Sequence, residues 1–161
     1  MNDLANELQE RGGGDATGAP AIFVFIHGLP RFKKLKQEDD FSFSGGDEAG
    51  SNPGAQLGTL ISEGPGLGMH LVASVDTFNN VGRFLSRKAL SEFEMRVVFQ
   101  MSANDSASLI DSPKAGNLGL HRALLYNEHE GYLETFRPYA APDPGWIADA
   151  AAKLSRTHSA P

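Results

Sequence analysis

The stretch APAIFVFIHGLPRFKKLK, from Ala19 to Lys36, contains a run of five apolar residues, Ile22–Ile26, that ends at His27 and Gly28. Most residues of this run are β-branched or aromatic, which is typical of a short strand buried on both faces. We therefore predict a strand over Ala21–His27. In parallel sheets, functional groups usually lie just beyond the carboxyl ends of the strands. The residues at positions 27 and 28 are therefore the first candidates for a functional site.

The rest of the chain alternates between helical and strand patterns. Two further apolar runs predict strands over Met69–Asp76 and Met95–Ser102. Residues 121–137 predict a hairpin with its turn at 128–131. Helices are predicted over residues 3–11, after the first strand around Leu29, Phe32 and Leu35, from the Asn52-Pro53 start, over 79–93, over 104–111 and over 143–156. This order predicts an α/β fold with a mainly parallel sheet, a C-terminal β-hairpin and a terminal helix that docks through Trp146 and Ile147.

Composition excludes several classes of protein. The formal charge of −6 argues against a free-standing nucleic-acid binder, because phosphate contacts need a cationic surface. The absence of cysteine excludes disulfides and thiolate-metal sites. The longest apolar run is far too short to cross a bilayer, and the first residues lack the features of a secretion signal. We therefore expect a cytoplasmic protein without an integral membrane segment.

Two charged segments follow the first predicted strand. The basic cluster is best explained as a solvated helix face, with contacts to a partner's phosphates as the alternative; it consists of Arg31, Lys33, Lys34 and Lys36. The next segment, QEDDFSFSGGDEAGSN at residues 37–52, is rich in acidic residues, Gly and Ser and predicts a mobile surface insertion. The expected organisation is a part at 1–36 with a helix and strand, the insertion at 37–52, a main part at 53–145, and a terminal helix and tail at 146–161.

Two local motifs are best explained as turns that bind no ligand. The segment GPGLG at Gly64–Gly68 resembles a phosphate-binding loop in composition, but it follows a predicted helix and precedes a strand, so we predict a turn. No G-x-x-x-x-G-K-[ST] pattern occurs anywhere in the sequence. Glu128, His129 and Glu130 could ligate a metal, but consecutive turn residues point in different directions. A solvated hairpin tip is the better interpretation, and we predict no metal site.

Four blocks of the sequence together resemble the carboxyl-terminal half of the FtsK/SpoIIIE family of DNA-translocating ATPases. They lie in the stretches EGPGLGMHLVASVDT (63–77), FEMRVVFQMSANDSASLIDSP (93–113) and NLGLHRALLY (117–126). The blocks follow the family patterns xGIHLVLATQRP, R-I-x-F-x-V-S, D-S-R-T-I-L-D and L-L-G-x-G-D-M-L-Y in order, over about half of the chain. Residues 1–62 fit the family more loosely, as a helix and a Walker-B-like strand. The resemblance implies part of a RecA-like P-loop NTPase sheet.

The resemblance also implies that the catalytic motifs are degenerate. In members that hydrolyse ATP, the Walker B strand ends in Asp-Glu, which organise the Mg²⁺ shell and the attacking water. These positions fall on His27 and Gly28, and the Gln that senses the γ-phosphate falls on Asp76. Neutral imidazole is a poor Mg²⁺ ligand and Gly has no side chain. We therefore expect no intact catalytic residue, and no hydrolysis by this chain alone.

Other family properties carry over as expectations. Arg96, Gly119 and Arg122 are the candidate nucleotide-binding residues, although Arg96 could equally be structural and pack under the third strand. ATP and Mg²⁺ are the family's cofactors, and we expect this chain not to bind them alone. The implied partners are a homo-oligomeric ring or the missing N-terminal half with its Walker A loop, and DNA. Membrane association would come only through a longer parent protein.

Two functions remain open on these grounds. The first is a fragment or degenerate module of an ATP-driven DNA translocase of the DNA segregation and cell division type. The second is a nucleotide-independent binding or regulatory module of a secretion-type motor, because type VII secretion ATPases carry degenerate modules of this kind. The third possibility is purely structural: the sheet motif is kept only because it packs well.

Overall fold

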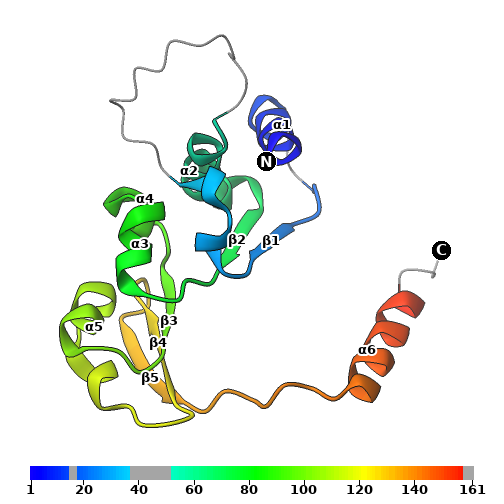
Figure 1. Ribbon diagram of the computed structural model, residues 1–161. Coiled ribbons are helices and arrows are strands. Elements are labelled where there is room, and N and C mark those ends of the chain that lie inside the picture. Colours follow the sequence, from blue (N-terminus) through cyan, green and yellow to red (C-terminus); the bar gives the residue numbers. More distant parts are fainter. Residues whose placement is uncertain (15–17, 37–51, 158–161) are drawn as a thin grey trace. The chain divides into compact units, whose positions relative to one another are not determined.

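In a computed structural model, the first two predicted strands form β1 (Ile22–Ile26) and β2 (Met69–Ala73) (Figure 1). The structure describes residues 1–14, 18–36 and 52–157, with side chains as far as Ser155. The expected mobile insertion, apart from Asn52, lies outside these residues. The chain divides into two compact units, Met1–Met95 and Arg96–Pro161.

The first unit contains a two-stranded parallel sheet. Its elements besides the strands are α1 (Asn2–Gly13), η1 (Leu29–Arg31), η2 (Lys33–Leu35), α2 (Pro53–Glu63), η3 (Pro65–Leu67), α3 (Phe78–Phe84) and α4 (Arg87–Ser91). β1 and β2 are parallel neighbours, with Ile22 opposite Met69 and Ile26 opposite Ala73. The prediction that these two apolar runs lie side by side is confirmed.

Local signals explain where the helices of this unit begin and end. The Asn52 side chain accepts hydrogen bonds from the backbone N–H groups of Gly54 and Ala55, so it caps α2 as predicted. The Gly64–Gly68 segment forms the predicted turn through η3. The helix predicted over 79–93 is instead divided into α3 and α4, because the Ser86 side chain caps a new helix start by accepting from Ala89 N at 3.0 Å.

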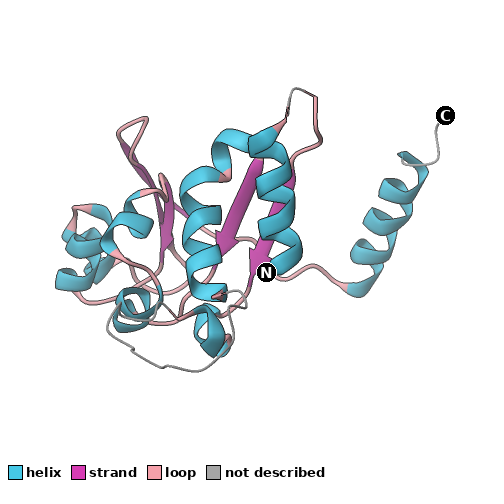
Figure 2. Ribbon diagram, turned by 90° about the horizontal axis from the view of Figure 1, so that it is seen from above, coloured by secondary structure: helices cyan, strands magenta, loops and turns pink. Residues whose placement is uncertain are grey.

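One face of the parallel sheet is covered by helices. Leu8 of α1 and Leu60 of α2 are buried together with Met69 of β2, and Ile22 and Val24 of β1 pack against them. Figure 2 shows these two helices running alongside the strands on that face. The core of this unit therefore forms from alternate residues of each strand.

In the described part of the first unit, the opposite face of the same sheet is open. Phe23, Phe25 and Val72 are 59%, 74% and 49% exposed, and the Phe23 ring stacks on His70 with 5.0 Å between centroids. The prediction that the first strand is buried on both faces is therefore wrong for these residues. Successive side chains of a strand point to opposite faces, and in the described residues the helices of the unit cover only the face that carries Ile22 and Val24.

The second unit is built on an antiparallel hairpin. Its elements are β3 (Met95–Val98, which starts at the unit boundary), α5 (Ala103–Ile110), η4 (Pro113–Asn117), β4 (Ala123–Asn127), β5 (Tyr132–Phe136) and α6 (Pro144–Thr157). β4 and β5 are antiparallel, with Ala123 opposite Phe136, which confirms the predicted hairpin. Buried apolar residues of this unit are Val98, Leu109, Ile110, Ala115, Ala123 and Leu124.

The third predicted strand does not extend the parallel sheet. The strand order is β1-β2 in one sheet and β3-β4-β5 in the other. The expectation of a single, mainly parallel sheet is therefore wrong, although the fold is α/β. The physical reason is that β3 pairs with β4, while Arg96 of β3 donates to Leu109 O of α5 and to Glu128 in the hairpin turn.

The terminal helix forms close to its predicted bounds but does not dock as expected. Trp146 and Ile147 are 62% and 52% exposed, and Leu154 on the same helix is 70% exposed. Among the described residues, no helix has the length and apolar character needed to cross a membrane.

Candidate functional site at the strand ends

The carboxyl ends of β1 and β2 are joined by backbone hydrogen bonds beyond the strands themselves. Ser74 N donates to Ile26 O at 2.9 Å, and Leu29 N donates to Ser74 O at 2.9 Å. These two bonds hold the chain on both sides of His27 against the end of β2. Residue 27 therefore lies at the edge of the sheet where functional groups of parallel sheets are usually found.

The Ser74 hydroxyl organises this end of the sheet. It accepts the Gly28 N–H at 2.9 Å and lies 3.0 Å from His27 Nδ1. Because the oxygen already accepts one hydrogen, its own hydrogen is available to His27 Nδ1 when the imidazole carries its proton on Nε2. The result is an imidazole–hydroxyl pair at the position where the resemblance implies carboxylates.

Gly28 has a backbone conformation that selects glycine. Its φ is 71° and its ψ is 62°, in the left-handed region, and it is the N-cap residue that precedes η1. A Cβ at this position would lie 3.2 Å from Arg31 Cδ. A left-handed conformation is unfavourable for other residue types, so a Glu here would be strained. The structure therefore gives a backbone reason why residue 28 does not carry an acidic side chain.

Asp76 lies just beyond the end of β2 but takes part in a local contact. Asn80 Nδ2 donates to Asp76 Oδ1 at 2.8 Å, and Thr77 caps α3 by accepting Asn80 N at 3.3 Å. The hydrogen bond from Asn80 holds the pKa of the Asp76 carboxyl below its ordinary value of 3.8. This carboxylate is exposed and ionised at neutral pH, and it stabilises the start of α3.

The donor set at these strand ends does not fit Mg²⁺. The ion prefers oxygen ligands, mainly carboxylates and water, whereas His27 and Ser74 offer an imidazole and a hydroxyl that hydrogen-bond to each other. In the part of the chain that the structure describes, no three His, Asp or Glu side chains gather at one place. Hydrogen bonding to a partner group is the chemistry that this pair can supply.

The candidate residues of the second unit have different surroundings. Arg96 donates to Leu109 O at 2.8 Å and to Glu128 Oε2 at 3.0 Å, and its guanidinium lies 5.6 Å from the centre of the Tyr126 ring. These contacts support the structural interpretation of Arg96. Gly119 has a φ of 75° and donates its N–H to the Gln100 side chain at 2.8 Å. Arg122 is exposed in the loop before β4.

The two charged motifs of the sequence are exposed, as their interpretation as solvated surface requires. Glu128, His129 and Glu130 form the turn between β4 and β5. The basic residues after β1 are exposed on and beside η1 and η2. A role of the basic cluster in binding phosphates stays a prediction.

Sequence reasoning missed Ser74, which makes more contacts at this site than His27 does. The apolar pattern predicts a second strand that runs to Asp76 and includes Ser74, whereas β2 ends at Ala73. The available signal was a small polar residue near the end of an apolar run, in the strand expected to neighbour the first.

Comparisons with protein-family models, curated proteins and solved structures gave no match for this chain.

Proposed function

We propose that this chain is the distal half of an FtsK/SpoIIIE-like P-loop module that has lost hydrolysis and works within a larger ATP-driven assembly. The four sequence blocks that resemble the family motivate the proposal. The observation that carries it is the parallel pair β1–β2, whose ends hold His27 and Gly28 through Ser74. The parallel strand pair supports the proposal, and residues 27 and 28 carry no carboxylate.

The small size of the parallel sheet and its uncovered face support a missing half. Helices α1 and α2 cover one face of the strand pair, and β1 leaves Phe23 and Phe25 exposed on the uncovered face. An α/β sheet normally carries helices on both faces. A RecA-like domain completed by a segment with a Walker A loop would supply further strands and the second layer of helices.

Calorimetric titration with ATP and Mg²⁺ tests this proposal. The chain alone should give no binding heat and no turnover, because its strand ends hold no carboxylate pair. The chain joined to the segment encoded immediately upstream should bind nucleotide. Turnover by the chain alone that disappears in His27→Ala would overturn the proposal.

One observation favours the alternative of a nucleotide-independent module of a secretion-type motor. Arg96, a candidate for contacting nucleotide, is held by Leu109 O and Glu128. The same titration separates the two functions, because a nucleotide-independent module shows no heat with ATP even in the joined form. For that alternative, the joined protein should bind a protein subunit of the motor with equal affinity with and without ATP.

A further inference from the structure

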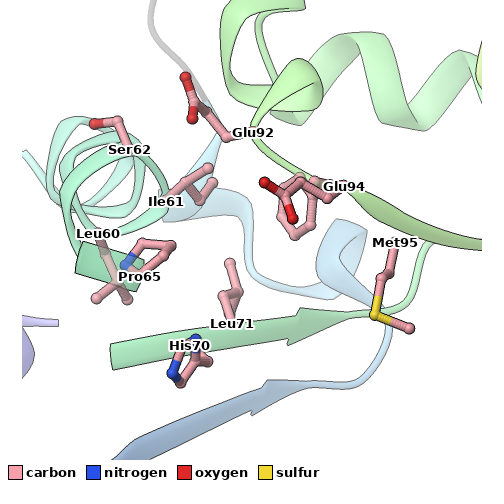
Figure 3. A pocket seen from close by; sticks show the side chains of 10 residues that line it. Leu60, Ile61, Ser62, Pro65, His70, Leu71, Glu92, Glu94 and Met95 are labelled. Carbon is pink, nitrogen blue, oxygen red and sulfur yellow. The ribbon is translucent and has the colours of Figure 1, made fainter. Parts of the chain in front are cut away.

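A pocket of about 350 Å³ in the first unit lies at one edge of β2 (Figure 3). His70 and Leu71 both line it. Successive residues of a strand point to opposite faces of the sheet, so a pocket that touches both must lie at the strand's edge. Since β1 occupies the other edge, the pocket lies on the side of β2 that faces away from β1.

The backbone of β2 is available on this edge at Leu71, whereas at Met69 the N–H already donates to Gly64 O at 2.8 Å. Gly68 O and Ser74 N bond to β1, at Ile22 N and Ile26 O. In a parallel ladder, alternate residues direct their N–H and C=O groups to the same neighbour, so Leu71 directs its backbone groups away from β1. Among the described residues, β1 is the only strand paired with β2. An open strand edge of this kind is a template for pairing with another chain.

The lining of the pocket is apolar on one part and acidic on another. Leu60 and Ile61 of α2 contribute apolar side chains, together with Leu71. Glu92 and Glu94, from the segment that follows α4, bring two exposed carboxylates on the opposite side from His70 (Figure 3). A group that fills this pocket should have an apolar body and a positive end. Lys and Arg side chains combine these properties, because their methylene stems pack on apolar surface while the charged head stays at the rim.

We propose that this edge of β2 binds an extended strand of another polypeptide by β-addition, with a Lys or Arg side chain of that strand in the pocket. In this mode the main chain supplies affinity and the side-chain pocket supplies specificity. The open backbone at Leu71 favours a peptide over a small organic cation, which would leave those groups unused. The inference does not rest on the proposed function, because no nucleotide takes part in it.

The probe is a fluorescein-labelled, capped heptapeptide of alternating Thr and Val with a central Arg, followed by fluorescence anisotropy. It should bind saturably, and a peptide with central Glu should bind at least about tenfold more weakly, because two carboxylates then repel it. A peptide methylated at alternate backbone nitrogens should bind more weakly by a similar factor, because it cannot form the backbone hydrogen bonds to β2. Hydrogen exchange at the Leu71 amide should slow only when the Arg peptide is bound.

Matched variants test the acidic rim. The double variant Glu92→Gln and Glu94→Gln should weaken binding of the Arg peptide by about three- to tenfold, as expected for two exposed charge pairs. Glu134→Gln, an equal change at an exposed position of β5, should leave the affinity unchanged. Equal binding of the Glu-centred or the methylated peptide, or failure of the Arg peptide to saturate, would overturn the proposal, whether or not the double variant folds.

Discussion

Replacing Gly28 tests whether the backbone at the end of β1 excludes an acidic residue. The φ of 71° places Gly28 in the left-handed region, where any other residue costs about 1–2 kcal/mol. The new Cβ would lie 3.2 Å from Arg31 Cδ, at the end of a flexible part of that side chain, which can move at small cost. We therefore expect Gly28→Ala to lower the free energy of unfolding by about 1–2 kcal/mol, and Gly28→Glu by at least as much.

Gly58 provides the matched control. It lies inside α2, where a Cβ would meet nothing within 4 Å. Alanine is favoured over glycine in a helix by about 0.5–1 kcal/mol, so Gly58→Ala should stabilise the same unit. The two Gly-to-Ala changes should therefore have opposite signs.

Urea unfolding followed by circular dichroism measures both variants. Because the chain has two compact units, which can unfold separately, a local measurement is also needed. Hydrogen exchange at the Leu29 amide, which donates to Ser74 O, reports on the strand ends directly. If Gly28→Ala is as stable as the unmodified chain, or more stable, residue 28 does not adopt a left-handed conformation in solution. The backbone explanation for the absence of an acidic residue at position 28 is then wrong.

Three further predictions concern single contacts. Because the pKa of Asp76 is lowered on folding, the ionised Asp76 carboxylate stabilises the fold above pH 3.8, and this stabilisation is lost as the pH falls through the lower folded pKa. Asn80→Ala should return the pKa of Asp76 toward 3.8, which a carboxyl NMR titration would show. Arg96→Lys keeps the charge but cannot reproduce the guanidinium contacts, and it should lower stability by about 1–2 kcal/mol in urea unfolding; an unchanged midpoint would contradict the structural role. Ser106 is fully buried and its hydroxyl accepts a backbone N–H, so Ser106→Ala should cost about 1–3 kcal/mol, whereas Ser108→Ala at an exposed position of α5 should change little in the same assay.

Features with a local cause could be predicted from the sequence. The start of α2 follows from the capping side chain of Asn52 and the fixed φ of Pro53, which act within a few residues. The apolar runs located β1 and β2, and their parallel pairing follows because a helix returns the chain between them. The break between α3 and α4 was missed because apolar spacing continues across Ser86, although its hydroxyl provides a second cap.

Features that depend on distant partners could not be predicted. An apolar run shows that a strand can be buried, but it does not identify what covers it, so the exposure of Phe25 has no signal in the sequence. The pairing of β3 depends on which strand edge is available to it. Ser74 is one of many serines, and its role appears only when β1 and β2 are in register, with Ile26 opposite Ala73.

The open face and the open edge of the parallel sheet are separate properties, and they can be occupied separately. A helix packed on the open face would bury Phe25 without protecting the Leu71 amide, because that amide lies in the plane of the sheet. A strand added to β2 would protect the Leu71 amide and leave Phe25 accessible. A completed P-loop module would do both, since it adds strands and a second layer of helices. Hydrogen exchange at Leu71, measured together with solvent accessibility of the Phe25 ring, therefore separates the proposed missing half from a partner that binds only by strand addition.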